Sequence, residues 1–156
     1  LLAVLAVGLY DQTTPAYRPP YEISEGLWDQ DRAFARTLEQ RLPDRAMVAQ
    51  LPYETFPEPP AARQAVYEPI KPYFHSDSLR WSWGAMRGRP EDWAATIADK
   101  PAAEVVAAAR QEGFAGILVD RLGYADDGAA MDADLRRALG AEPLGSPNGR
   151  YLFWRL

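Results

Sequence analysis

The chain has 156 residues and no cysteine, carries a net charge of −5 at pH 7 and is 47% hydrophobic. A chain of this length forms one domain that can bury a core without metal or disulfide support. The lack of cysteine excludes a disulfide framework, a thiol nucleophile and a cysteine zinc site, and a single histidine excludes a histidine-rich metal site. The negative charge argues against non-specific binding to nucleic acid, which needs a positive field.

The first ten residues, LLAVLAVGLY, are apolar throughout, and the sequence becomes polar at Asp11. A membrane helix needs about 20 residues, so this stretch is too short to span a bilayer. It also lacks the basic start and the cleavage site of a signal peptide. Two interpretations stay open for residues 1–10: the end of a transmembrane helix with Tyr10 at the interface, or a buried first strand. Residues 11–156 are expected to form a single soluble domain.

Apolar spacing and proline positions predict the elements of the first half of the chain. Residues 11–28 are polar and rich in proline, which predicts an extended segment. From residue 29 or 31 to residue 42, apolar side chains recur every four positions and predict a helix. Ala46–Leu51 is a short apolar run and predicts a core strand. A long proline-rich connection over residues 52–78 follows, with a helical turn expected near Ala61–Tyr67.

Strand and helix patterns alternate in the second half of the chain. The expected elements are a strand at Leu79–Trp83, helices over about 90–98 and 101–111, a strand at Ala115–Val119, a helix over about 129–139, and a hairpin over 142–156. This order predicts an α/β or α+β fold with a mixed β-sheet of about four to five strands flanked by helices.

The strand predicted at residues 79–83 carries a suggestive cluster of side chains: Arg80, Trp81 and Trp83, with Arg87 just beyond. Aromatic faces stack on sugar rings or cations, and arginine holds phosphate or carboxylate in a bidentate manner. The cluster would suit an anionic glycan or a lipid-linked sugar phosphate. In the alternative interpretation, the tryptophans belong to the core and the arginines are solvated or paired.

A charged pair, Asp120 and Arg121, directly follows the predicted strand at Ala115–Val119. In open α/β sheets, ligands bind at the carboxyl ends of strands, so this pair could contact a ligand. The alternative is a structural ion pair, or an aspartate that caps the next turn.

Two further groups contain residue types that can catalyse reactions. His75-Ser76-Asp77 has the three triad types, but sequence neighbours rarely face one another as a triad requires, and no nucleophile elbow surrounds the serine. Glu54 and Glu58, or Asp120, could act as a pair of glycosidase carboxylates. The sequence has no GxGxxG, no P-loop and no calcium loop, so neither a cofactor nor a metal is expected.

Three stretches carry a family resemblance: Leu38-Glu39 through Phe56-Pro57-Glu58, Leu79-Arg80-Trp81-Ser82-Trp83-Gly84-Ala85, and Gly113-Phe114 through Gly123-Tyr124. They resemble the soluble C-terminal part of large multi-spanning bacterial inner-membrane proteins, which look like the GT-C class of polyprenyl-phosphate-sugar glycosyltransferases. The resemblance covers most of residues 9–156.

This resemblance implies a domain on the periplasmic side of the inner membrane, with residues 1–10 as the stub of the last membrane helix. In such enzymes the catalytic carboxylate lies in the membrane domain, so this part would not be catalytic alone. The expected function is an accessory domain that binds or positions a glycan or lipid-linked sugar, with its own membrane domain as partner. The candidate surface consists of Arg80, Trp81, Trp83, Arg87, Asp120, Arg121 and Tyr124. Two alternatives remain: a structural or protein-interaction module, and a glycan hydrolase.

Overall fold

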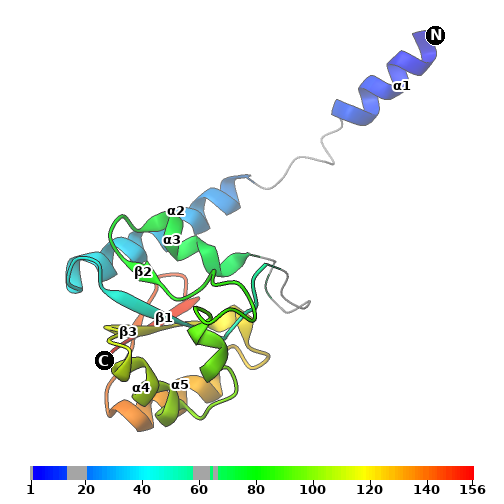
Figure 1. Ribbon diagram of the computed structural model, residues 1–156. Helices are drawn as coiled ribbons and strands as arrows, with labels where there is room; N and C mark the ends of the chain where they lie inside the picture. The colour runs from blue at the N-terminus through cyan, green and yellow to red at the C-terminus, as the bar shows by residue number, and fades with distance from the viewer. Residues whose placement is uncertain (1, 14–20, 58–63, 65–66) are drawn as a thin grey trace.

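The computed structural model describes residues 2–13, 21–57, 64 and 67–156 (Figure 1). Its centre is a mixed sheet with the strand order β2-β1-β3-β5-β4. β1 pairs in parallel with β2 and β3, whereas β5 runs antiparallel to β3 and β4. The predicted mixed sheet with flanking helices is therefore confirmed. The strands are β1 (Met47–Leu51), β2 (Arg80–Trp81), β3 (Gly116–Asp120), β4 (Leu144–Gly145) and β5 (Tyr151–Arg155).

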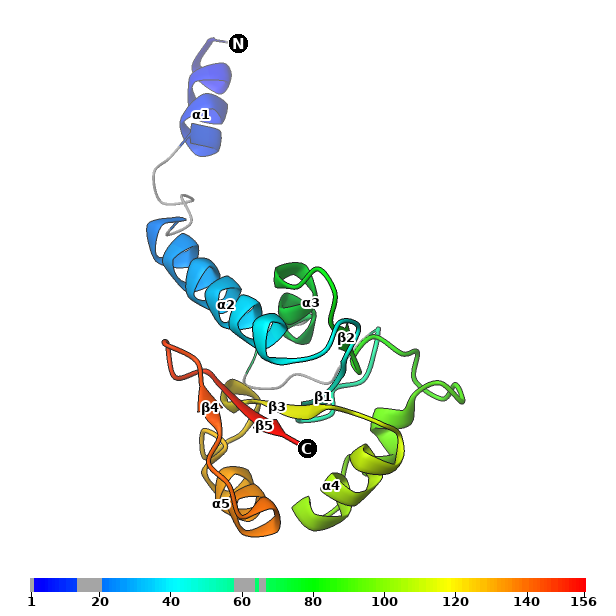
Figure 2. The same ribbon diagram turned by 90° about the vertical axis from the view of Figure 1, so that its left-hand side faces the viewer.

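Helices cover both faces of the sheet (Figure 2). On one face lie α2 (Tyr21–Arg41) and α3 (Lys71–His75); on the other lie α4 (Ala102–Gln111) and α5 (Ala129–Leu139). Since side chains alternate along a strand, β3 supplies both cores. Leu118 packs on the α2 side with Leu38, while Ile117 packs on the α4 and α5 side with Leu135. Short 3₁₀ helices complete the described fold: η2 (Glu68–Ile70), η3 (Trp93–Ile97) and η4 (Arg121–Gly123).

The second helix begins earlier than the sequence predicted. The extended segment predicted over 11–28 is wrong where the structure describes it, because residues 21–28 belong to α2 and residues 11–13 end the first helix. The physical reason is that Leu27 and Trp28 are in helical phase with Phe34 and Leu38, so one apolar stripe runs along the whole helix. Residues 14–20 lie outside the described residues.

The apolar N-terminal stretch is helical. α1 (Leu2–Thr13) has no buried residue, so the buried-strand interpretation of residues 1–10 is wrong for the residues described. A strand would need a sheet neighbour, and α1 lies apart from the sheet (Figure 1). No helix among the described residues combines the length and apolar character needed to cross a membrane. The interpretation as the end of a membrane helix stays a prediction.

Other elements differ in extent. β2 covers two residues and not Leu79–Trp83, because side chains take over the pairing at its end: the Gln50 N–H donates to Ser82 Oγ (2.8 Å), and the Trp83 N–H donates to Gln50 Oε1 (3.0 Å). The helix predicted over 90–98 is only the 3₁₀ turn η3. The predicted helices over 101–111 and 129–139, and the final hairpin, are confirmed. The turn expected near Ala61–Tyr67 falls mostly outside the described residues.

Candidate functional site

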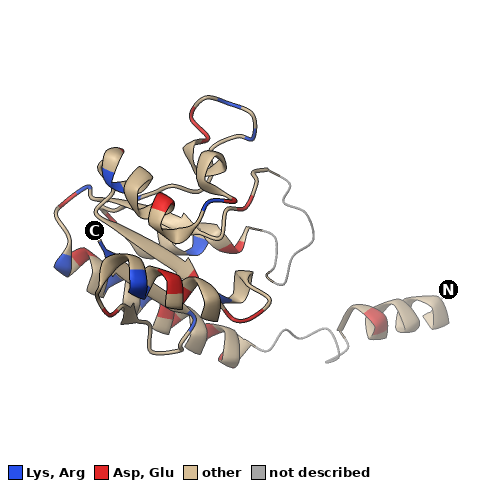
Figure 3. Ribbon diagram, turned by 90° about the horizontal axis from the view of Figure 1, so that it is seen from below, with Lys and Arg blue, Asp and Glu red and all other residues tan. Residues whose placement is uncertain are grey.

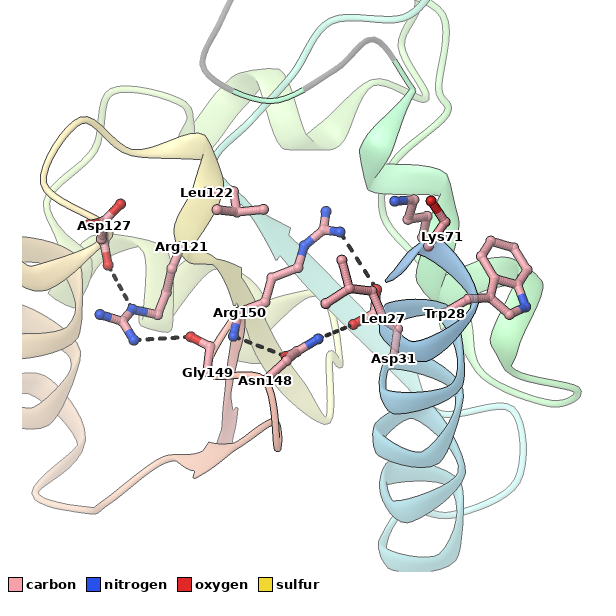
Figure 4. Close-up of a pocket in the computed structure, with 11 residues that line it drawn as sticks. Leu27, Trp28, Asp31, Lys71, Arg121, Leu122, Asp127, Asn148, Gly149 and Arg150 are labelled. Carbon is pink, nitrogen blue, oxygen red and sulfur yellow. Dashed lines mark hydrogen bonds and ion pairs between the residues drawn. The ribbon is translucent and has the colours of Figure 1, made fainter. Parts of the chain in front are cut away.

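A pocket of about 560 Å³ lies where β3 ends and η4 begins (Figure 4). Its volume is within the roughly 300–1,000 Å³ of typical small-molecule sites. α2 forms one wall, and η4 with the β4–β5 turn forms the other. The lining residues are Ser24, Leu27, Trp28, Asp31, Lys71, Arg121, Leu122, Asp127, Asn148, Gly149 and Arg150.

Arg150 lies at the base of this pocket and joins four elements. Its side chain is 9% exposed, and Nη2 contacts Oδ2 of Asp120 at 2.5 Å and Oε2 of Glu68 at 2.8 Å. Its Nη1 lies 3.6 Å from Oδ2 of Asp31, and the guanidinium stacks over the Tyr151 ring at 4.7 Å. One cation therefore holds α2, η2 and β3 against the start of β5.

Burial and ion pairing have opposite effects on the pKa values of the groups in this cluster. Burial raises the pKa of Asp120 by more than the hydrogen bond from Arg150 lowers it. For Arg150, burial is the largest single effect and disfavours the cation, but the hydrogen bond to Asp120 and the charges of the neighbouring acidic groups together outweigh it and raise the pKa of the guanidinium. The arginine thus stays charged, and it offsets part of the cost of burying the carboxylates around it.

Arg121 lies at the rim and is held by backbone carbonyls. Its Nε donates to the Asp127 carbonyl at 2.7 Å, and its Nη1 donates to the Gly149 carbonyl at 3.0 Å. Arg121 forms no ion pair with a carboxylate in the part of the chain that the structure describes. The pocket therefore presents a fixed cation that no described carboxylate pairs with.

The three sequence candidates near the end of β3 have different surroundings. Arg121, just beyond the carboxyl end of β3, lines the pocket. Asp120 is buried against Arg150 and also accepts the Leu122 N–H at 3.2 Å, so both structural alternatives considered for it are present. Tyr124 packs against the core on the α4 and α5 side, where burial raises its pKa.

Most of the candidates around β2 lie at a second, separate pocket. Arg80, Trp81 and Trp83 line a largely apolar pocket of about 460 Å³, and none of its described lining residues lines the first pocket. The two tryptophans are half-buried, and Nε1 of Trp81 donates to Ser76 Oγ at 2.7 Å. Arg87 is exposed and lines neither pocket. The seven candidate residues therefore do not form one groove.

The remaining chemical candidates have structural partners. His75 is buried against Trp28, with ring centroids 4.2 Å apart, while Ser76 donates to the Pro72 carbonyl and Asp77 pairs with Arg36. The three side chains thus have different partners, and no triad forms. Glu54 accepts a hydrogen bond from Gln64 at 2.5 Å, and Glu58 lies outside the described residues.

A search of the described residues for a cluster of acidic, histidine or cysteine side chains able to hold a metal ion found none.

Several pocket residues escaped the sequence reasoning. Trp28 and Asp31 continue the apolar phase of α2, and this spacing is the signal that could have identified them. Asn148 falls within the hairpin predicted over 142–156, which was not considered as a site. Nothing local marks Arg150, because its carboxylate partners come from distant parts of the chain.

Comparison of the chain with protein-family models, with curated protein sequences and with solved structures found no match. The chemistry of the pocket therefore carries the functional argument.

Proposed function

We propose that this domain binds an anionic saccharide, such as a sugar phosphate or a uronic acid, in the pocket between α2, η4 and the β4–β5 turn. It does so as a recognition domain of a membrane-bound, glycosyltransferase-like protein and is not itself the catalyst. One observation carries the proposal: Arg121 is fixed by two backbone carbonyls at the rim of a 560 Å³ pocket and has no carboxylate partner among the described residues.

A guanidinium held in this way suits an anionic group. Arginine presents its donors in a planar fork that matches the oxygens of phosphate or carboxylate. The bonds to Asp127 and Gly149 use part of the fork and restrict its rotation, so less side-chain entropy is lost when a ligand binds. Lys71 adds a second cation across the pocket, although it already pairs with Glu68 at 2.8 Å.

The other lining residues favour a saccharide over a bare anion. A sugar ring has hydroxyl edges and an apolar face. The Asn148 amide, which donates to Asp31 at 2.7 Å, lies on the polar side of the pocket, where it can bond hydroxyls. Leu27, Trp28 and Leu122 supply apolar surface on which a ring can pack (Figure 4).

Recognition is favoured over hydrolysis because the carboxylates at the base of the pocket are already engaged. Asp31 and Asp120 both face Arg150, and Glu54 is bound to Gln64 and lines only a small hollow of about 10 Å³. Glycoside hydrolysis needs two carboxyl groups that face the substrate across the scissile bond. The arrangement supports a site that holds its ligand without cleaving it.

Isothermal titration calorimetry with glucose, glucose 1-phosphate and glucuronic acid tests the proposal. We expect the anionic sugars to bind and neutral glucose to bind at least tenfold more weakly. The Arg121→Gln variant should lose about tenfold or more in affinity, because a hydrogen bond to a charged group contributes about 1.5–3 kcal/mol. The matched control is Arg80→Gln at the second pocket, which should bind as the unmodified chain does.

Two results would overturn the proposal. Equal affinity for glucose and glucose 1-phosphate would remove the anionic requirement. Loss of binding in Arg80→Gln, with Arg121→Gln unaffected, would move the site to the pocket beside β2. Thermal unfolding of both variants by circular dichroism shows whether any change in affinity arises from a change in folding.

A second candidate function, a protein-interaction module, is favoured by one observation. The N-terminal half of α2 exposes Tyr21, Ile23 and Leu27 to solvent. Exposed apolar surface of this kind marks interaction sites. A chain that binds none of the saccharides but forms a stable complex through these residues would establish this function instead.

A further inference from the structure

The apolar stripe of α2 continues past the part of the helix that the sheet covers. In the covered half, Asp31, Phe34, Ala35 and Leu38 are buried. In the other half, apolar residues at the same helical phase are exposed, with Ile23 at 67% exposure. A stripe that is buried along half of a helix and uncovered along the rest indicates a further contact.

α3 widens this uncovered surface. The ring centroid of Phe74 lies 6.5 Å from that of Trp28 and 5.9 Å from that of Tyr73. Phe74 is 58% exposed although it is aromatic. We call the whole surface the apolar strip; it consists of Tyr21, Ile23, Leu27, Trp28, Tyr73 and Phe74. Because Leu27 and Trp28 also line the first pocket, the strip and the pocket are continuous.

The helix that precedes the strip in sequence is apolar on every side. α1 has no charged residue before Asp11, near its C-terminal end, and none of its residues is buried (Figure 3). A protein partner would cover one side of such a helix, whereas lipid covers all of them. At about 1.5 Å per residue, α1 would extend about 18 Å, or about three-fifths of a hydrocarbon core of about 30 Å.

Chain length keeps the strip near the end of α1. Eight peptide steps separate Thr13 from Tyr21, and a fully extended chain covers at most about 3.5 Å per step. The beginning of α2 therefore lies within about 28 Å of the last residue of α1. If α1 is in lipid, the strip is held close to the bilayer surface.

We propose that the apolar strip rests on the interface of a lipid bilayer into which α1 inserts, so that the pocket opens beside the membrane. Tyr and Trp favour the headgroup level, where the apolar part of the side chain contacts lipid and its polar group contacts water. The polar side of α2 carries Glu22, Glu25 and Asp29, and the chain has a net charge of −5. The interface that fits is a zwitterionic one, because anionic lipid repels these charges. The inference rests on the proposed membrane attachment, but not on what the pocket binds.

The lack of cysteine makes a direct test possible. Single-cysteine variants Leu5→Cys, Ile23→Cys and Phe74→Cys, each labelled with an environment-sensitive fluorophore, are mixed with phosphatidylcholine vesicles. The control is Arg137→Cys on α5, on the opposite face of the sheet and 75% exposed. We expect a blue-shifted emission and quenching by brominated lipid at positions 5, 23 and 74, and no change at position 137.

Three results would overturn the inference. Labels at positions 23 and 74 that stay water-like while the label at position 5 enters lipid would separate the strip from the interface. A label at position 23 shielded without vesicles, together with a dimer mass in sedimentation, would show that a second copy covers the strip. Stronger binding to anionic than to zwitterionic vesicles would contradict the charge argument. None of these readouts depends on saccharide binding, so failure of the pocket proposal is recognised separately.

Discussion

Replacing Arg150 by glutamine tests the cluster that positions the pocket. The variant removes a cation that Asp31, Glu68 and Asp120 share, at distances of 3.6, 2.8 and 2.5 Å. Two of these carboxylates, Asp31 and Asp120, are at least 90% buried. Breaking a buried pair by removing one partner typically costs about 3–5 kcal/mol, because it leaves charge uncompensated. We expect Arg150→Gln to lose free energy of unfolding in this range at pH 7.

Thermal and urea unfolding followed by circular dichroism measure this loss. For a domain of this size, each kcal/mol of lost stability lowers the midpoint of thermal unfolding by about 2–4 °C. The midpoint of the variant should therefore fall by about 6–20 °C. The matched control is Arg137→Gln, which removes a pair with Asp134 at 2.9 Å that is largely exposed. An exposed pair contributes about 0–1 kcal/mol, so this control should unfold almost as the unmodified chain does.

The loss in Arg150→Gln should shrink as the pH falls. Burial already raises the pKa of Asp120 above its value in an unfolded chain. Such a carboxyl binds its proton more tightly when folded, so its contribution to stability increases as the pH falls and decreases as the pH rises through the folded pKa. Removing Arg150 raises that pKa further. We therefore expect the difference between variant and unmodified chain to be smaller near pH 4.5 than at pH 7.

A loss below about 1 kcal/mol at pH 7, similar to the control, would refute the reasoning, since it would show that the carboxylates lie in a solvated environment. A large loss that is the same at both pH values would also refute it, because uncompensated carboxylates must respond to protonation.

Three other predictions concern the core and a half-buried phenol. Gly116→Ala should lose about 1–3 kcal/mol in urea unfolding, because the added methyl group would come within 2.7 Å of the Trp154 carbonyl, whereas Gly145→Ala, which has ordinary contacts, should lose less. Leu135→Ala should lose about 2–5 kcal/mol by the same measurement, since the side chain is fully buried. Burial and the hydrogen bond to Asp92 raise the pKa of Tyr53 to about 12, so this phenol should stay protonated at pH 11. The contribution of Tyr53 to stability should fall as the pH rises above about 10, where an unfolded tyrosine ionises. An ultraviolet titration in which Tyr53→Phe loses a transition near pH 10 would contradict this prediction.

The sequence was most informative where one local pattern decided the structure. β3 is a run of buried aliphatic residues, and α5 keeps its apolar residues on one stripe and ends at Gly140, which adopts a left-handed conformation. α2 was predicted too short because the polar residues of 21–28 hid the apolar phase of Leu27 and Trp28. β2 was predicted too long because the Gln50 side chain, and not strand pairing, accepts the Trp83 N–H.

For the site, a topological rule led from the sequence to one residue that lines the pocket, and ligand contact by this residue stays a prediction. Arg121 was singled out because it follows a core strand, and it lines the pocket. Arg150 could not be identified in this way, since its role depends on Asp31 and Glu68, which only the fold brings next to it. The aromatic cluster at Trp81 and Trp83 was a strong local pattern, yet the structure places it at a different pocket.

Arg121 and Arg150 line the same pocket, but only one of them can report on binding alone. Arg150 compensates buried carboxylates, so its removal changes the fold and the pocket together. Arg121 donates to the carbonyls of Asp127 and Gly149, and losing these two bonds costs about 1–3 kcal/mol. The structural cation thus holds the walls in place and leaves the rim cation available for a ligand. A ligand that stabilises the unmodified chain but not Arg121→Gln against heat would demonstrate this division of roles, because binding stabilises only a folded state that retains its contact.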